Sequence, residues 1–110
     1  MIITPSQKYA KICDICFNKY HLYVRPRTYD YITYWYNPKT SGEIVKYDEY
    51  WDKITIATMV IVTDDNRLLF CMNEKVEFED FEQAIDDLML EYKKALVRLK
   101  VQELGKDFQV

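Results

Sequence analysis

Residues 53–73 read KITIATMVIVTDDNRLLFCMN and predict a β-hairpin. Two apolar runs flank the polar triplet Asp64–Asn66, and β-branched residues beside a turn signal are typical of antiparallel strands. The longer run, Ile54–Val62, is interrupted by Thr55 and Thr58 and is far shorter than the ~20 apolar residues of a membrane-spanning helix. The hairpin therefore supplies the third and fourth strands of the predicted sheet.

The segment before this hairpin extends the sheet toward the N-terminus. Residues 22–37, LYVRPRTYDYITYWYN, are dense in β-branched and aromatic residues and predict one strand that is interrupted near Pro26. Residues 37–42, NPKTSG, predict a turn, and Glu43–Tyr47 a returning strand. The four strands are expected to form an antiparallel meander.

A helix is predicted at the N-terminus. In TPSQ, residues 4–7, Thr4 stands where an N-cap belongs, proline occupies the first helical position and glutamine can reach back to the cap. The helix should therefore run from about Pro5 to Tyr20.

A second, longer helix is predicted over residues 79–105, EDFEQAIDDLMLEYKKALVRLKVQELG, with Asp80 as N-cap and Gly105 as terminator. The predicted fold is a single α+β domain spanning residues 1–110. Its four-stranded antiparallel sheet is flanked by an N-terminal helix and a long C-terminal helix, in the order αββββα.

Charge and composition narrow the class of protein. The chain has 110 residues and a formal net charge of -3, but its first 47 residues are net basic and the acidic excess is concentrated in residues 74–91. Such a stretch is typical of a solvated surface, and a phosphate-mimicking surface is the functional alternative. There is no basic and apolar leader and no apolar run of membrane-spanning length, so a cytoplasmic location is expected.

The cysteine pair in YAKICDICFNKYH, residues 9–21, has three interpretations. On a helix, Cys13 and Cys16 share the apolar stripe with Tyr9 and Tyr20, which favours ordinary core packing. A redox pair would lie at the N-terminus of a helix, whereas Cys13 and Cys16 lie two turns into the predicted helix. A zinc site would combine the two cysteines with the chain's other metal-binding candidates, His21 and Cys71. We expect core packing, with no metal and no cofactor.

The aromatic region between Tyr20 and Trp51 is interleaved with basic residues. Aromatic rings beside cations are used by proteins that bind single-stranded nucleic acid, although tyrosine is also common in cores and protein interfaces. In strand register, Tyr29, Tyr31, Thr33 and Trp35 share one face, while Asp30, Ile32, Tyr34 and Tyr36 share the other, so one aromatic row should belong to the core. The candidate nucleic-acid face comprises Arg25, Arg27, Tyr29, Tyr31 and Trp35.

The long helix has two apolar faces. The face that should cover the sheet comprises Phe81, Ile85, Leu88, Tyr92, Ala95 and Leu99. The opposite face comprises Leu90, Val97, Val101 and Leu104. A monomer should be polar there, so this second face predicts a protein interface, either a homodimer about a two-fold axis or packing against the first helix.

No motif for catalysis was found. The sequence has neither a phosphate loop, a nucleophile elbow nor an H-E-x-x-H, and carboxylates such as Asp48, Glu49 and Asp52 are best interpreted as solvated. The expected function is a small non-enzymatic protein-binding module that forms a homodimer. Its residue usage suggests an AT-rich genome, consistent with an accessory or inhibitor protein of a phage or mobile element. The alternative is single-stranded nucleic-acid binding through residues 20–51.

Overall fold

The computed structural model describes residues 3–25 and 31–107, and for residues 106 and 107 the backbone alone. Its helices and strands are α1 (Pro5–Cys13), the π-helical turn η1 (Asp14–Lys19), β1 (Tyr23–Arg25), β2 (Ile32–Tyr36), β3 (Val45–Asp48), β4 (Lys53–Val62), β5 (Leu68–Val76), the 3-10 turn η2 (Phe78–Asp80) and α2 (Phe81–Asp107). The predicted α+β class, with one antiparallel sheet and a helix at each end, is confirmed.

The sheet has five strands in the order β1-β2-β3-β4-β5, all antiparallel, so the prediction of four strands was wrong. The segment predicted as one interrupted strand forms two neighbouring strands, with Tyr23 opposite Tyr36 and Arg25 opposite Tyr34. Proline has no N–H to donate to a strand ladder, and β1 ends at Arg25, directly before Pro26. The interruption therefore separates two strands of the sheet.

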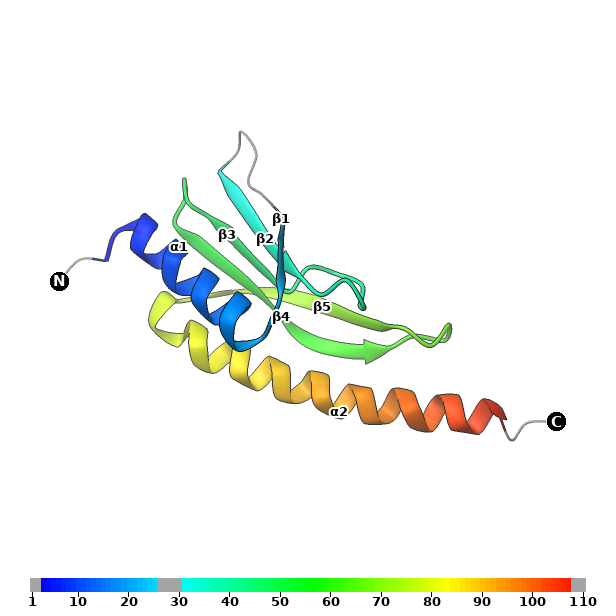
Figure 1. Cartoon of the computed structure of the whole chain (residues 1–110). Helices are drawn as coiled ribbons and strands as arrows, with labels where there is room; N and C mark the ends of the chain where they lie inside the picture. The colour runs from blue at the N-terminus through cyan, green and yellow to red at the C-terminus, as the bar shows by residue number, and fades with distance from the viewer. Residues whose placement is uncertain (1–2, 26–30, 108–110) are drawn as a thin grey trace.

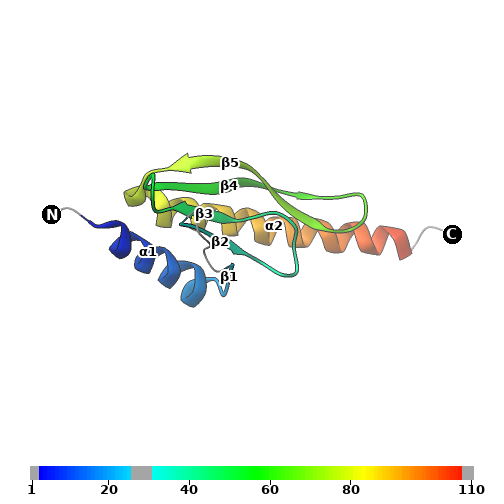
Figure 2. The same ribbon diagram turned by 90° about the horizontal axis from the view of Figure 1, so that it is seen from above.

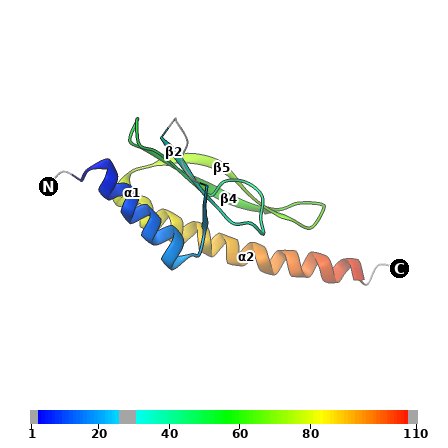
Figure 3. The same ribbon diagram turned by 45° about the horizontal axis from the view of Figure 1, so that its top comes forward.

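Both helices lie on the same face of the sheet (Figures 1 and 3). Ridges from α1 and α2 meet a row of side chains that alternate along the strands, which is the two-layer arrangement expected when an amphipathic helix covers one face of a sheet. Buried residues at this junction include Ile12, Cys16, Trp35, Val45, Tyr47, Ile56, Phe81, Ile85 and Ala95. The predicted sheet-covering face of α2 is confirmed, since its members are buried or half-buried.

The N-terminal helix begins as predicted but changes type along its length. The Thr4 hydroxyl accepts from the Gln7 N–H (3.2 Å) and the Gln7 side chain accepts from the Thr4 N–H (2.9 Å), which completes a capping box. The α-helical part ends at Cys13, and the chain continues through the wider η1 to Lys19. The chain then leaves at His21 with φ +56, in the left-handed conformation that ends many helices.

The long helix begins at Phe81, directly after Asp80 as predicted, but differs from its prediction at the C-terminal end. Asp80 is the last residue of the 3-10 turn η2, and α2 begins at Phe81. Gly105 lies inside α2, which continues to Asp107. A glycine ends a helix when it takes a positive φ, and Gly42 is the glycine that does so here.

The connection between β2 and β3 attaches to the edge of β5 that faces away from β4. The Ser41 N–H donates to the Leu68 carbonyl and the Phe70 N–H donates to the Ser41 carbonyl, both at 2.9 Å. The next residue, Gly42, has φ +87, and a Cβ built on it would lie 2.2 Å from the Phe70 carbonyl oxygen. Position 42 therefore requires glycine, which has no Cβ and takes a positive φ without strain.

We predict that Gly42→Ala lowers the free energy of unfolding by about 1–3 kcal/mol or more, because the new methyl group clashes and φ becomes strained. Gly105→Ala is the matched control: nothing lies within 4 Å of its Cβ position. Alanine inside a helix should stabilise by up to about 1 kcal/mol. Urea unfolding of both variants measures the difference, and equal effects would contradict the role given to Gly42.

Two aspartates connect helices to the rest of the fold. The Lys8 ammonium on α1 lies 2.7 Å from the Asp52 carboxylate, which also accepts from the Tyr47 hydroxyl at 2.9 Å. The Lys8 hydrogen bond, helped by Tyr47, holds the pKa of Asp52 below its usual range. Burial, followed by the hydrogen bond to Asp52, raises the pKa of Tyr47. The tyrosine thus stays neutral and fixes the β3–β4 turn to α1.

The second aspartate, Asp86, joins the end of η1 to α2. It accepts from the Tyr20 hydroxyl and lies 2.9 Å from the Lys19 ammonium. The Tyr20 hydrogen bond and then the Lys19 hydrogen bond lower the pKa of Asp86, while burial and the Asp86 hydrogen bond raise the pKa of Tyr20 to about 12. An aspartate with a lowered pKa in the folded state stabilises above its unfolded pKa, and the contribution is lost as pH falls through the folded value.

We therefore predict that Asp86→Asn lowers stability at neutral pH and flattens the loss of stability between about pH 5 and pH 2. The measurement is chemical unfolding across this range. Asp87→Asn serves as control, because its carboxylate accepts from the neutral Gln83 amide at 2.9 Å. If the free energy of unfolding of the Asp86 variant fell with pH as steeply as that of the wild type, this carboxylate would not link the helices.

Candidate interaction surfaces

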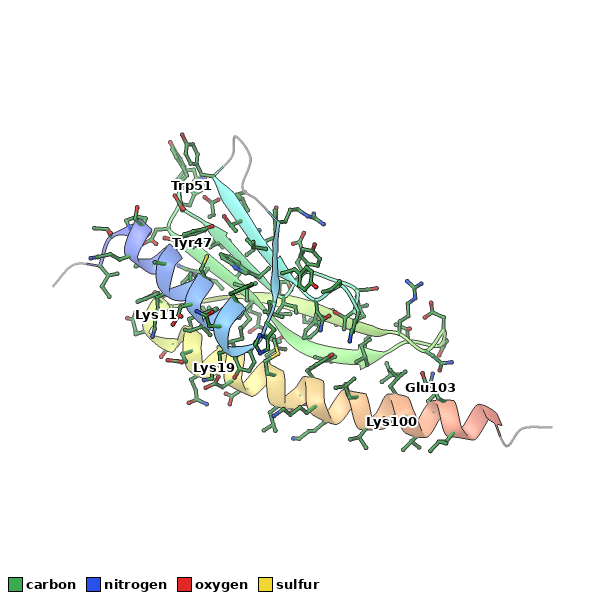
Figure 4. The ribbon with its side chains drawn as sticks, in the orientation of Figure 1. Lys11, Lys19, Tyr47, Trp51, Lys100 and Glu103 are labelled. Carbon is green, nitrogen blue, oxygen red and sulfur yellow. The ribbon has the colours of Figure 1, made fainter. Side chains whose placement is uncertain are left out.

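The second apolar face of α2 lies open. Its four residues, Leu90, Val97, Val101 and Leu104, are 53%, 63%, 63% and 56% exposed. Val97, Val101 and Leu104 belong to the C-terminal half of α2, where Lys100 and Glu103 are also placed (Figure 4), and Leu90 precedes them by two turns. Soluble monomers rarely present such a row of aliphatic side chains to water.

The inner side of this half of α2 makes mainly polar contacts. Ala95 is its last fully buried residue. Further along, the Arg98 guanidinium donates to the Val60 carbonyl (3.2 Å), and the Gln102 amide donates to the Thr63 carbonyl (3.1 Å) and to the Asn66 side chain (2.6 Å). The helix is thus fixed against the β4–β5 hairpin on one side, and its other side stays uncovered.

The long helix makes the molecule elongated. The molecule measures 61 × 27 × 23 Å, and its radius of gyration is 15.8 Å. A compact chain of this length would have a radius of gyration of about 13 Å. Seen from above, the C-terminal part of α2 extends past β1, β2 and β3, with only the β4–β5 hairpin beside it (Figure 2).

The N-terminal helix does not cover the open face of α2. It meets the opposite end of α2, where Lys19 lies 2.9 Å from Asp86 and 3.5 Å from Glu82. Packing of the first helix over Val97 and Val101, the alternative left by the sequence, is therefore wrong. The physical reason is that α1 packs against the sheet at the buried Trp35, whose ring centroid lies 5.9 Å from that of Tyr9.

The candidate nucleic-acid residues do not form one surface. Trp35 is 1% exposed and lies beneath α1, so its ring is unavailable to a base, and this part of the prediction was wrong. Tyr31 and Arg25 are exposed. Arg27 and Tyr29 lie outside the described residues.

The opposite face of the sheet carries the exposed aromatic and basic groups instead. The Arg25 guanidinium lies 6.0 Å from the Tyr34 ring centroid and 5.8 Å from that of Tyr36, within range of a cation–π contact. The Tyr36 ring also lies 6.0 Å from Tyr23. Neither helix covers this face, which we call the open sheet face.

A straight row of side chains crosses the open sheet face. Arg25 pairs with Tyr34, Tyr34 with Lys46, Lys46 with Thr55, and Thr55 with Lys75, so each of the five strands contributes one residue. Directly opposed residues on antiparallel strands point to the same side. The alternation of residues 31–36 was visible in the sequence, but the partners on β3, β4 and β5 depend on the strand register.

Two further aromatic side chains are exposed at the turn between β3 and β4. Tyr50 and Trp51 are each 74% exposed and contact each other edge to face, with ring centroids 5.0 Å apart. The Trp51 N–H donates to the Asp48 carboxylate at 3.1 Å, which holds the turn. Trp51 lies at the end of the sheet beside the N-terminal half of α1 (Figure 4).

The cysteines belong to the packing of the fold. Cys16 is fully buried, and Cys13 packs at the edge of the same cluster, so the core interpretation is confirmed for this pair. Burial raises the pKa of both thiols, which keeps them protonated and unreactive. Among the residues that the structure describes, no group of three or more His, Cys, Asp and Glu side chains is arranged to hold a metal ion.

Absence of zinc therefore stays a prediction. We expect no stoichiometric zinc by elemental analysis, and we expect Cys16→Ser to lower the free energy of unfolding by about 1–3 kcal/mol, because a hydroxyl in an apolar site lacks a partner. One zinc ion per chain, or unfolding by a chelator, would contradict the packing role of this cysteine.

Comparison with known proteins gives no further assignment. No protein-family model, no curated protein and no solved structure matches this chain. Within residues 3–25 and 31–107, no helix is both long and apolar enough to cross a membrane.

Proposed function

We propose that this chain is a non-enzymatic protein-binding module that forms a homodimer through α2. The observation that supports it is the row Leu90, Val97, Val101 and Leu104, which the monomer leaves more than half exposed. Burying this row removes apolar surface from water at roughly 25 cal/mol per Å². A second copy supplies an identical row, so one self-complementary patch serves both chains.

The spacing of the row suits a helix pair. Its members follow one another at intervals of seven, four and three residues, the spacing of a packed seam in coiled coils. From Leu90 to Leu104 the seam is about 21 Å long at 1.5 Å per residue. Charged side chains of both signs, including Lys94, Lys100 and Glu103, are exposed nearby and provide the polar rim of an ordinary protein interface.

The residue usage of the chain indicates the kind of genome that encodes it. The scarcity of glycine beside ten tyrosines fits an AT-rich genome, such as that of a phage or mobile element. We propose that the dimer acts as an accessory or inhibitor protein of such an element by binding another protein. The exposed Tyr50 and Trp51 of the β3–β4 turn remain available for a partner when α2 pairs with α2.

The test replaces Val97 and Val101 by glutamate. Light scattering of the wild-type protein should give twice the chain mass of 13.3 kDa, and the double variant should be a monomer with unchanged helix content, because both side chains are exposed within one chain. Phe17→Glu is the matched control: Phe17 is 64% exposed but lies on η1, so this variant should stay dimeric.

Two results would contradict the dimer. One is a wild-type protein that is monomeric at high concentration. The other is a Val97→Glu, Val101→Glu double variant that keeps the dimer mass, since buried unpaired charges at the seam should cost several kcal/mol.

A further inference from the structure

The open sheet face concentrates positive charge in an acidic protein. Arg25, Lys46 and Lys75 stand in the cross-strand row, and Lys53 stands in the neighbouring row beside Asp48. The chain as a whole has a formal net charge of -3. A cluster of one sign on one face attracts ligands of the opposite sign even when the net charge of the protein repels them.

The carboxylates near this face leave the row basic. Glu77 lies 3.8 Å from the Lys75 ammonium, and both side chains are more than half exposed, so water screens this pair. Asp48 accepts from the Trp51 N–H and is directed to the β3–β4 turn. Three cations thus remain along the row for an anionic ligand.

Aromatic rings lie beside these cations. Tyr34 follows Arg25 in the row, and Tyr36 and the 56%-exposed Tyr23 form the next pair along the strands. Their rings face the side of the sheet that carries Arg25, as the cation–π distances of 5.8 and 6.0 Å show. Bases stack on tyrosine rings and on arginine planes with little dependence on sequence.

We propose that the open sheet face binds single-stranded nucleic acid, with phosphates on Arg25, Lys46 and Lys75 and bases on Tyr23 and Tyr36. Four strand spacings of about 4.8 Å make the row about 19 Å long, enough for roughly three nucleotides. The ligand is single-stranded because a duplex keeps its bases stacked and presents only phosphates to a flat face. The α2 seam lies on the other side of the sheet, so this proposal does not depend on the dimer.

The experiment measures fluorescence anisotropy of a labelled oligothymidylate about 12 nucleotides long. Three phosphate contacts should weaken wild-type binding roughly 20-fold between about 50 and 200 mM salt. The variant Lys46→Gln, Lys75→Gln retains Arg25 and should bind at least tenfold more weakly at the lower salt, with a salt effect of only about threefold. Lys11→Gln, Lys93→Gln makes the same charge change on exposed positions of α1 and α2 and should bind like the wild type.

A second variant pair tests base stacking. Tyr23→Leu should weaken oligothymidylate binding severalfold and leave inorganic polyphosphate binding unchanged, because polyphosphate has no bases. Phe17→Leu removes an exposed aromatic ring on η1, outside the open sheet face, and serves as its control.

Several results would overturn the proposal. They are no binding at the lower salt, equal losses in the two lysine variants, and tighter binding of a duplex than of the single strand. Equal affinity for polyphosphate together with an unaffected Tyr23→Leu variant would show a simple anion-binding face and would also refute it.

Discussion

A single sheet that receives both helices on one face is the constraint on which the rest of this structure depends. Trp35, Tyr47, Ile56 and their neighbours form the buried side, and α1 and α2 together cover it. A two-layer domain of this kind has no third layer to cover the far side of the sheet or the far side of the helices. The surfaces available for binding are therefore set by the architecture, one on each outer side of the molecule.

The helix pair keeps its place on the sheet through polar contacts at its ends. Asp86 joins η1 to α2, Asp52 joins α1 to the β3–β4 turn, and Arg98 joins α2 to β4. Each contact lies at the margin of the apolar core, where water still reaches part of the side chains. Such contacts contribute modestly to stability but fix the angle and register of helices that apolar packing alone would leave free to slide.

The sequence predicted the parts of this fold that depend on local patterns. The Thr4 capping box, the hairpin around residues 64–66 and the sheet-covering side of α2 follow from residue spacing, and all three are present. The number of strands could not be predicted, because a proline within an aromatic run is compatible with one bent strand or with two paired ones. The pairing of Tyr23 with Tyr36 decides between them, and that is a tertiary contact.

The candidate surfaces were predictable to different degrees for the same reason. Helical periodicity alone identified the second apolar side of α2. By contrast, both sides of β2 are aromatic, so the side that would meet α1 was not visible in the sequence, and Trp35 was assigned to the surface. The row from Arg25 to Lys75 joins residues from all five strands, and no short motif can reveal it.

The attachment of Ser41 to β5 has a consequence for how the chain folds. The β4–β5 hairpin closes a short turn and is expected to form early, whereas the contacts of Ser41 with Leu68 and Phe70 join residues far apart in the sequence and are expected to form later. Until then the outer edge of β5 offers unpaired N–H and C=O groups to any extended chain nearby. Aggregation during refolding should therefore compete with this late closure, which protects the edge of β5 at Leu68 and Phe70.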